Sequence, residues 1–344
     1  MIRRLLFLFA AFLSPVAGFC QETPYRAQYI DDEKFMRVFE KAILKLAEDG
    51  KGIKGREFRS QMNRKTCDIP PAPPSAPILA PEEIYTGCSG GVMAICSAFK
   101  SATTGGWEAG DPATAWVLTP DGVMVSNYHI FAGAEKEEVF AVMSRDGVFY
   151  PVTEILAADK VNDIVIFKIH AKGLQPLALA GDEPVGKKVF VISHPDHQFY
   201  TFTQGHITRY TVQYDDPKQP PIKYLCTTAE FARGSSGGPV LNEHGAVIGM
   251  VCSTRNTYYG EKNKDADDDV QMIVKFCIPC ESIRALLKPT PLLSSKPPDK
   301  SEPPKIKPAP EPSEVKPPSP PPPPPPEPVP PRAEPVPEPV SGQP

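Results

Sequence analysis

Between residues 83 and 288, short runs of β-branched and other apolar residues alternate with turn signals. Pro120-Asp121-Gly122 and Asp146-Gly147 are two of the turn sequences that separate the runs. Many short strands at this spacing are typical of an all-β sandwich or barrel pair, and not of a parallel α/β sheet. The expected strands are Gly91–Ile95, Ala115–Leu118, Val123–Ser126, Glu138–Val142, Asp163–Ile169, Lys188–Ile192, Gly205–Tyr210, Val247–Cys252 and Met272–Cys277. A final helix at Glu281–Leu287 is expected to complete this domain, residues 83–288.

Prolines set the limits of this domain, since most of the 44 prolines in the 344 residues fall in two stretches. Residues 69–82 are expected to form a stiff Pro/Ala linker, because proline fixes φ and lacks an N–H. Residues 289–344 include an unbroken proline run from Pro320 to Pro326 and offer almost no side chains to bury. We therefore expect a disordered Pro-rich tail, largely polyproline II, that serves as a spacer or as a peptide ligand for a partner or the cell envelope.

The N-terminal helical segment, residues 21–68, contains one amphipathic pattern over residues 31–49. Asp31 or Asp32 can cap the start of this helix, and Gly50 can end it. We expect its apolar stripe to dock on the main domain, because an exposed stripe of this size is unusual; a partner-binding or oligomerising helix is the alternative. The stripe consists of Phe35, Val38, Phe39, Ala42, Ile43 and Leu46, at the three–four spacing of a helix.

Residues 1–20 have the pattern of a signal peptide. Arg3 and Arg4 precede the apolar run Leu5–Leu13, which is followed by small residues. The run is well short of the ~20 residues that span a bilayer, which argues against the alternative of a retained membrane anchor. Cleavage after Gly18 and cleavage after Cys20 both fit, and the mature protein is expected to be periplasmic or extracellular.

The formal net charge of −4 and the pI near 5.9 give no reason to expect nucleic-acid binding. Some of the eight cysteines are expected to be bridged in an exported protein, and Cys88 with Cys96 is the first pair to test. Cys277-Ile-Pro-Cys280 has the spacing of a redox or zinc motif, but no second pair stands at ligand spacing. The acidic run ending at Asp269 lacks the spaced ligands of a calcium loop. We therefore expect no metal and no other cofactor.

The strongest chemical signal is Gly234-Ser235-Ser236-Gly237-Gly238-Pro239. A reactive serine needs an exposed hydroxyl and main-chain N–H groups that converge where an oxyanion will form. Flanking glycines allow the tight backbone path that this requires. The sequence thus predicts Ser236 as nucleophile and the N–H groups of Gly234 and Ser236 as the oxyanion hole.

Serine needs a base within hydrogen-bond reach, and the candidate is His129 at the end of the apolar run Val123–Ser126. The base in turn needs a buried carboxylate that fixes its tautomer. Asp163 opens the apolar run that ends at Ile169, where an unpaired buried charge would be costly, whereas the rival Asp159 lies outside the run. The predicted catalytic residues are therefore His129, Asp163 and Ser236.

The order His…Asp…Ser, within Ser-Asn-Tyr-His129, Asn-Asp163-Ile and Gly-Ser-Ser236-Gly-Gly-Pro, resembles the trypsin-like (chymotrypsin-fold) serine proteases, most closely their HtrA-type branch. The resemblance covers about residues 85–288. It implies two six-stranded antiparallel barrels with the site in the cleft between them. HtrA-type enzymes usually carry a PDZ domain after the protease, whereas here the proline-rich tail follows, so no PDZ domain is expected. Digestive trypsins have an aspartate where Ser235 stands, so their zymogen switch is not expected either.

The same resemblance suggests residues that contact a substrate. Glu230 lies six residues before Ser236, where trypsin-like enzymes floor the pocket for the residue before the cleaved bond, and an acid there would select Lys or Arg. We favour the alternative that Glu230 pairs with Arg233 or points to solvent, because so long a side chain fits poorly in a pocket base. Cys252, Ser253 and Thr254 are expected to line the substrate as an extended strand.

These residues predict a secreted or periplasmic serine endopeptidase that cleaves protein or peptide substrates through an acyl-enzyme. The alternative is a catalytically inactive protease fold that binds peptides as a chaperone or scaffold. The presence of all three predicted catalytic residues argues against that alternative.

Overall fold

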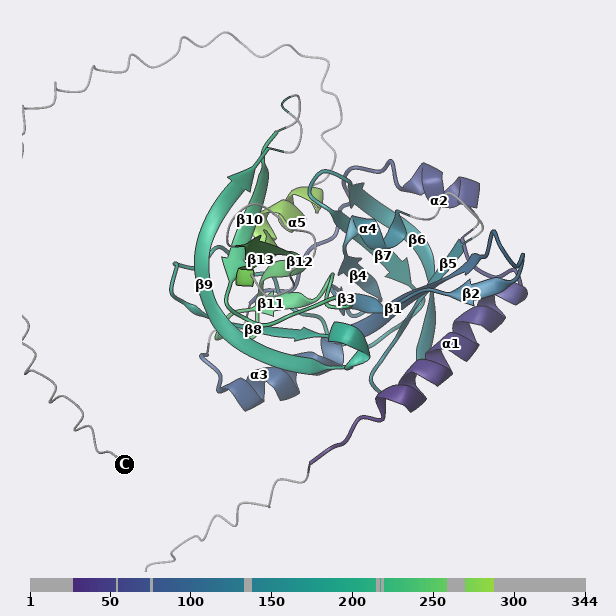
Figure 1. Ribbon diagram of the computed structural model, residues 1–344, viewed down its shortest axis with the longest axis horizontal. Coiled ribbons are helices and arrows are strands. Elements are labelled where there is room, and N and C mark those ends of the chain that lie inside the picture. The colour runs from purple at the N-terminus through teal and green to yellow at the C-terminus, as the bar shows by residue number, and fades with distance from the viewer. Residues whose placement is uncertain are drawn as a thin grey trace, which may run out of the picture. The chain divides into compact units, whose positions relative to one another are not determined.

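The computed structural model describes residues 27–287 except 54, 75–76, 133–137, 215–216, 218–219 and 259–269. The predicted signal peptide, the Pro-rich tail and the acidic run ending at Asp269 lie outside the described residues. Strands are the main regular structure of the described chain and form two antiparallel barrels (Figure 1), which confirms the predicted fold class.

The first barrel is closed because β1 pairs with both β3 and β5, so that six strands form a ring in the order β1-β3-β4-β7-β6-β5. β2 is added at one edge, outside the ring, as a partner of β1. The strands are β1 (Val92–Lys100), β2 (Trp107–Ala109), β3 (Ala113–Val117), β4 (Val123–Ser126), β5 (Glu138–Met143), β6 (Phe149–Asp159) and β7 (Ile164–Ile169).

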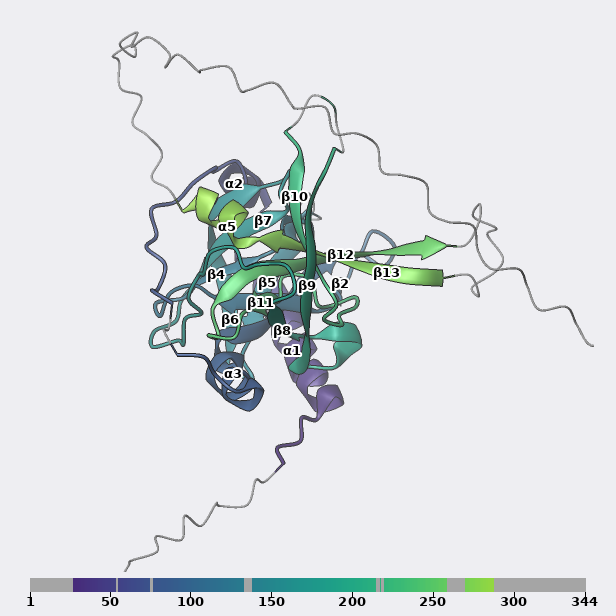
Figure 2. The same ribbon diagram turned by 90° about the vertical axis from the view of Figure 1, so that its left-hand side faces the viewer.

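The second barrel is a closed ring of six strands in the order β10-β13-β12-β11-β8-β9. Its strands are β8 (Lys188–Ser193), β9 (Thr201–Gln213), β10 (Ile222–Thr227), β11 (Pro239–Leu241), β12 (Val247–Tyr258) and β13 (Val270–Pro279). Figure 2 shows that the β9–β10 and β12–β13 pairs continue beyond the barrel as two long ribbons. The strand expected to end at Cys252 is longer than predicted, because β12 continues to Tyr258. The expected strands omitted β2, β6, β10 and β11.

Five α-helices accompany the barrels in the described part of the chain: α1 (Asp32–Glu48), α2 (Gly55–Gln61), α3 (Pro81–Cys88), α4 (Tyr128–Phe131) and α5 (Cys280–Leu286). The sequence predicted α1 and α5 within one residue at each end. It did not predict α2, α3 or α4. Short 3-10 turns also occur at Ser89–Gly91 and Pro195–His197. Within these residues no helix is long and apolar enough to cross a membrane.

Helix α1 docks on the first barrel, as expected, and contacts β1, β2 and β5. Its start is fixed by Asp31, whose side chain accepts a hydrogen bond from the Lys34 N–H at 2.9 Å. Phe39 and Ile43 are fully buried in the interface, whereas Val38, which we had placed in the stripe, is 45% exposed. The buried face therefore differs from the predicted stripe: Val38 faces solvent, whereas Ala47, which was not predicted, is buried.

The predicted Pro/Ala linker is not a free spacer where the structure describes it. The Leu79 N–H donates to the Glu243 carbonyl at 2.8 Å, and the Pro77 carbonyl lies 2.8 Å from His244 Nδ1. Both partners belong to the turn that follows β11. The linker thus runs along the second barrel before α3 begins at Pro81.

The suggested Cys88–Cys96 disulfide is wrong. Cys88 ends α3, where its thiol donates to the Gly245 carbonyl at 3.4 Å. Cys96 lies within β1 and its thiol donates to the Gly110 carbonyl at 3.0 Å. Within the described residues the cysteines are all unpaired thiols, namely Cys67, Cys88, Cys96, Cys226, Cys252, Cys277 and Cys280.

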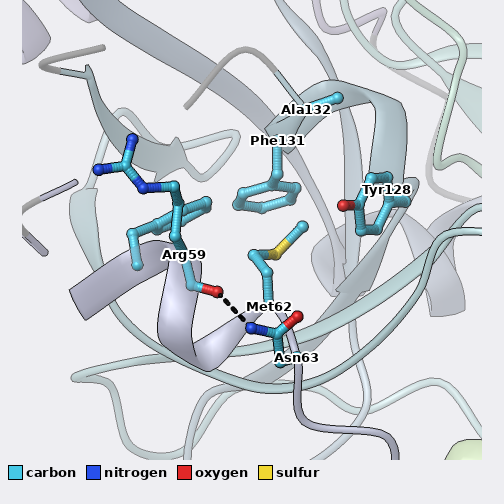
Figure 3. A pocket seen from close by; sticks show the side chains of 7 residues that line it. Arg59, Met62, Asn63, Tyr128, Phe131 and Ala132 are labelled. Carbon is cyan, nitrogen blue, oxygen red and sulfur yellow. Dashed lines mark hydrogen bonds between the residues drawn. The ribbon is translucent and has the colours of Figure 1, made fainter. Parts of the chain in front are cut away.

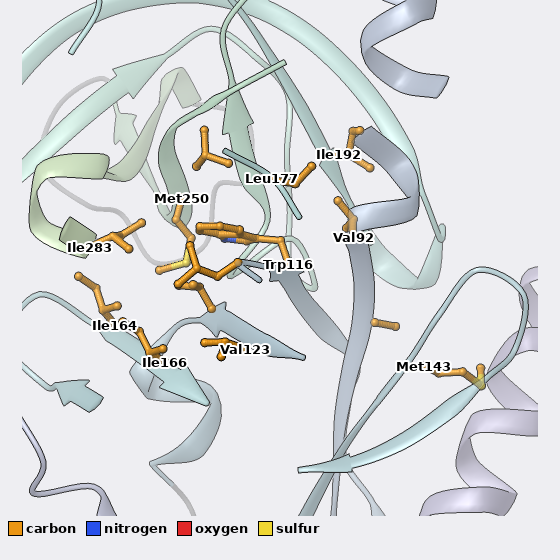
Figure 4. Close-up of a cluster of buried hydrophobic side chains, with 14 of the residues drawn as sticks. Val92, Trp116, Val123, Met143, Ile164, Ile166, Leu177, Ile192, Met250 and Ile283 are labelled. Atoms are coloured by element: carbon orange, nitrogen blue, oxygen red, sulfur yellow. The ribbon is translucent and has the colours of Figure 1, made fainter. Parts of the chain in front are cut away.

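One hydrophobic cluster spans both barrels and three of the helices (Figure 4). Fully buried Trp116 of β3 lies at its centre, near Met250 of β12 and Ile283 of α5. Phe39 of α1 belongs to the same cluster. Burial of apolar surface contributes about 25 cal/mol per Å², so a shared cluster opposes any shift of one barrel against the other. This arrangement fixes the loops that come from the two barrels and form the candidate site.

Candidate active site

The loop that carries Ser236 connects β10 to β11 and is tied to the neighbouring barrel. The Thr114 N–H donates to the Ser236 carbonyl at 2.9 Å, and the Thr114 hydroxyl donates to the Gly234 carbonyl at 2.9 Å. Gly237 has a φ of +86°, and a Cβ there would lie 2.0 Å from the Thr114 carbonyl oxygen. Only glycine fits such a position, because both the left-handed backbone and the close approach exclude a side chain. The glycines around Ser236 therefore serve the fold of the loop.

His129 and Asp163 come from the first barrel. His129 lies in α4, directly after β4, and Asp163 lies in the turn before β7. One carboxylate oxygen of Asp163 accepts from the His129 main-chain N–H, and the other lies 2.8 Å from His129 Nδ1. An ionised carboxylate only accepts, so Nδ1 carries a proton and Nε2 is the nitrogen that can take one.

The backbone of Asp163 is itself held in an uncommon conformation, with a φ of +56°. The Asn127 side-chain amide donates to the Asp163 carbonyl at 3.0 Å. A non-glycine residue at positive φ is strained and persists only where its surroundings fix it. The two bonds to His129 and the one from Asn127 supply that restraint.

Cys252 of β12 contacts both Ser236 and Asp163. The Ser236 hydroxyl donates to the Cys252 carbonyl at 3.4 Å, and the Cys252 sulfur lies 3.5 Å from the Asp163 carboxylate. Burial, followed by the nearby Asp163 charge, raises the pKa of Cys252 to about 12, so the thiol keeps its proton and acts as the donor. The structure therefore brings His129, Asp163, Ser236 and Cys252 to one place. No hydrogen bond joins Ser236 to His129 directly, although both residues are described.

The two predicted oxyanion donors belong to peptides whose carbonyls are already bonded elsewhere. The Arg233 carbonyl accepts from the Asp196 N–H at 2.7 Å, and the Ser235 carbonyl accepts from the Gly238 N–H at 2.9 Å. In a planar trans peptide the N–H points opposite to the C=O. The N–H groups of Gly234 and Ser236 therefore point away from these partners, and no acceptor contacts them among the described residues.

Ser235 is fully buried beneath the loop. Its hydroxyl accepts from the Ser193 hydroxyl at 3.0 Å and from the Ala232 N–H at 3.3 Å. Ser193 ends β8, so this contact ties the loop to the second barrel. A neutral hydroxyl pair therefore fills the place where digestive trypsins have a charged group.

Of the expected substrate-binding residues, Glu230 has a side chain that is 75% exposed and so points to solvent, as the favoured alternative predicted, but its ion-pair partner is not Arg233. Its carboxylate bonds to the ammonium of Lys275, whose side chain is 5% exposed. Arg233 pairs instead with Asp111. Ser253 and Thr254 are exposed on β12, opposite Phe276 and Lys275 of β13. The charge of Glu230 is thus compensated within the protein.

A hollow of about 280 Å³ lies beside the helix that carries His129 (Figure 3). Phe58 of α2 and Met62, directly after that helix, line one side of it, and Tyr128 and Phe131 of α4 line the other. No group of three or more His, Cys, Asp or Glu side chains within the described residues could hold a metal ion.

His194, at the start of the β8–β9 connection, is fully buried against the rings of Phe199 and Tyr200. Its Nδ1 accepts from the Tyr200 N–H at 3.0 Å. Burial lowers the pKa of His194 to about 4, and the main-chain carbonyls of Met93 and Ser193 oppose this shift only in part.

We expect the free energy of unfolding to fall as the pH drops from about 6.5, the value of an unperturbed histidine, to about 4, because the unfolded chain then binds a proton that the folded chain does not. In the variant His194→Asn, the free energy of unfolding should fall by about 3 kcal/mol less over this pH range than in wild type. Urea unfolding at several pH values measures this pH dependence. The control is His170→Asn, because His170 is exposed. Parallel profiles for wild type and His194→Asn would contradict the prediction.

Residues 113–250, which include the predicted catalytic residues, match the family model described as the trypsin-like peptidase domain. The chain carries a trypsin-like peptidase domain. The chain is also similar to curated proteins named DegP-like, Do-like and HTRA proteases, so the predicted resemblance to the HtrA-type branch is confirmed.

One relative of the peptidase domain is a "Probable periplasmic serine endoprotease DegP-like" from Hahella chejuensis, 28% identical over 146 residues, covering 42% of this chain and 30% of that protein. "Protease Do-like 5, chloroplastic" from Arabidopsis thaliana is 30% identical over 145 residues, covering 39% of this chain and 45% of that protein. "Serine protease HTRA2, mitochondrial" from Drosophila persimilis is 28% identical over 177 residues, covering 49% of this chain and 40% of that protein. The chain thus spans less than half the length of each of these proteins.

Proposed function

We propose that the chain is an exported serine endopeptidase that hydrolyses peptide bonds through an acyl-enzyme on Ser236. The observation that carries the proposal is the Asp163 carboxylate, which binds both the main-chain N–H and Nδ1 of His129 and so leaves Nε2 as the base. The contacts of Cys252 support it, because Cys252 bonds both the Ser236 hydroxyl and the carboxylate that binds His129.

In the proposed reaction the Ser236 hydroxyl turns from the Cys252 carbonyl towards His129. His129 Nε2 takes the proton as Ser236 Oγ bonds to the peptide carbonyl carbon. The N–H groups of Gly234 and Ser236 stabilise the oxyanion that forms. His129 then gives its proton to the leaving amine, and water releases the acyl group by the same steps in reverse.

We propose that the substrate is an extended peptide that lies along Cys252, Ser253 and Thr254, since an exposed strand can bind a peptide through main-chain hydrogen bonds. Glu230 is already paired with Lys275, so we expect it to give no preference for Lys or Arg before the cleaved bond. A peptide-library digestion read by mass spectrometry tests both statements. Cleavage mainly after Lys or Arg would contradict the second.

Export rests on the pattern of residues 1–20 and is supported by relatives whose names include the word periplasmic. N-terminal sequencing of the protein recovered from a cell-envelope fraction tests it. The expected new N-terminus follows Gly18 or Cys20. A full-length chain in the cytosol would contradict export and leave the proposed chemistry standing.

A fluorophosphonate probe tests the nucleophile directly in the folded chain. We expect one label, on Ser236, and none in Ser236→Ala. Ser144→Ala is the control, because this serine lies in the turn after β5 and its hydroxyl accepts from the Val148 N–H of the same turn. A folded wild type that takes no label, and that instead suppresses aggregation of an unfolded protein, would support the alternative of an inactive peptide-binding fold.

A further inference from the structure

The connection between β8 and β9, residues 194–200, contains an unusual number of strained residues. Asp196, His197 and Tyr200 have φ values of +46°, +63° and +60°, and none of them is glycine. Each residue in such a conformation costs of order 1–3 kcal/mol and persists only where surrounding contacts fix it. The contacts made by this connection therefore decide whether its conformation is kept.

Helix α1 supplies contacts on one side of the connection. The Asp32 carboxylate accepts from the Phe199 N–H at 3.0 Å. The ring of Phe35 packs on that of Phe199, with 4.3 Å between centroids, and meets the Tyr200 ring edge-on at 6.2 Å. Residues more than 160 positions apart in the chain thus hold each other through both a charge-assisted hydrogen bond and aromatic packing.

Helix α3 adds a smaller contact. The Tyr85 hydroxyl donates to the Tyr200 carbonyl at 3.3 Å. The Arg145 guanidinium lies over the rings of both tyrosines, 5.5 and 5.7 Å from their centroids. These groups support the end of the connection that leads into β9.

On its other side the connection holds the loop of the proposed oxyanion hole. The Asp196 N–H donates to the Arg233 carbonyl at 2.7 Å, which turns the Gly234 N–H of the same peptide in the opposite direction. Asp111 adds a second link, because it pairs with the Arg233 guanidinium and lies 3.7 Å from His197 Nε2. The orientation of the Arg233–Gly234 peptide therefore depends on the position of Asp196.

We propose that Asp32 and Phe35 of α1 are positioning residues for the hydrolysis: through residues 194–200 they fix the Arg233–Gly234 peptide with the Gly234 N–H facing the reacting carbonyl. The inference rests on the proposed function and adds a role for the N-terminal helix. When α1 no longer holds Phe199, the strained connection relaxes and the Asp196 N–H leaves the Arg233 carbonyl. Glycine at 234 leaves that peptide free to rotate, and one oxyanion donor is lost.

The test uses the full chain with Asp32→Ala, which removes the acceptor for the Phe199 N–H. Asp32→Asn keeps an acceptor oxygen at the same place, and Glu33→Ala changes a neighbouring residue that is 87% exposed and pairs only with Arg37. We expect kcat of Asp32→Ala to fall about tenfold or more. Removal of a whole oxyanion donor lowers kcat by about 10²–10³-fold, which sets the upper end of this effect. KM should change less than about threefold. Asp32→Asn should restore most of kcat, and Glu33→Ala should behave as wild type.

Two readouts separate positioning from a general loss of structure. A peptide aldehyde, whose carbonyl carbon bonds to Ser236 Oγ and leaves an oxygen at the oxyanion position, should lose affinity for Asp32→Ala in proportion to kcat. Amide hydrogen exchange should quicken at Asp196 and Ser235 in this variant, while amides of the barrel strands keep their protection. Phe35→Leu, which retains apolar bulk but not the ring contacts, should give a smaller change of the same kind.

Normal kcat, normal aldehyde affinity and unchanged exchange at Asp196 in folded Asp32→Ala would overturn the inference. A variant that loses protection throughout the chain would overturn it as well, since α1 would then be a general stabilising element. If wild type neither hydrolyses peptides nor binds the aldehyde, the proposed function fails. Unchanged exchange at Asp196 then overturns the positioning link, and quickened exchange at Asp196 and Ser235 supports it.

Discussion

Asp163→Asn is expected to lower kcat/KM for peptide hydrolysis by about 10⁴-fold, the loss that the corresponding change causes in a well-studied serine protease. The geometry gives the reason. An amide at this position keeps its oxygen on the His129 main-chain N–H, because that donor cannot change, and so turns its NH₂ towards Nδ1. Nδ1 must then accept, the imidazole proton moves to Nε2, and Nε2 can no longer take the proton of Ser236.

Asp159→Asn is the matched control for this variant. Asp159 lies four residues earlier and caps its own turn, where it accepts from the N–H groups of Val161 and Asn162. An amide oxygen can replace the carboxylate in that role, so steady-state kinetics should show a change of less than about threefold. Similar losses in the two variants would mean that Asp163 acts through the fold of the turn and not through the tautomer of His129.

Gly234→Ala is expected to lower kcat by about 10²–10³-fold, as removal of one oxyanion donor does. Gly234 has a φ of +90°, and a Cβ there would lie 2.4 Å from the His194 carbonyl oxygen. The loop must therefore move away from His194, and the Gly234 N–H moves with it. Single-turnover kinetics, which isolate the acylation step, measure the effect.

Gly186→Ala separates this displacement from backbone strain. Gly186 also has a φ of +90°, but no atom lies within 4 Å of a Cβ built there. Both variants carry the same left-handed alanine, which costs about 1–2 kcal/mol of stability. We expect only Gly234→Ala to lose activity. Equal kinetic losses would show that strain alone, wherever it lies, impairs the reaction.

The sequence predicted those parts of the site whose chemistry needs a particular side chain. Ser236, His129 and Asp163 stood out because each proposed role needs a recognisable local pattern, although the Asp163 side chain, expected to be buried, is 21% exposed. The glycines of the loop stood out for the same reason. Strands such as β4 and β7 were predicted well because they are short, apolar and bounded by turns.

The sequence could not predict the roles of main-chain groups. The Asp196 N–H orients the Arg233–Gly234 peptide, and any residue other than proline could supply that donor. The contact between the Cys252 thiol and the Asp163 carboxylate was not predicted, because the two residues are 89 positions apart and no local pattern links them. Helix α2 was missed because Phe58 is the only large apolar residue among its seven, so no helical period appears. Helix α3 was missed because it begins at Pro81, inside the stretch that its prolines predicted to be a linker.

The Cys252 thiol has a practical consequence for inhibitor profiling. A mercurial or other thiol-directed reagent that reached this sulfur would push Asp163 away from His129 and stop turnover, although the sulfur forms no bond with substrate. Such inhibition would imitate the pharmacology of a cysteine peptidase. The nucleophile of this chain is therefore best diagnosed with reagents that form a covalent bond to an oxygen atom.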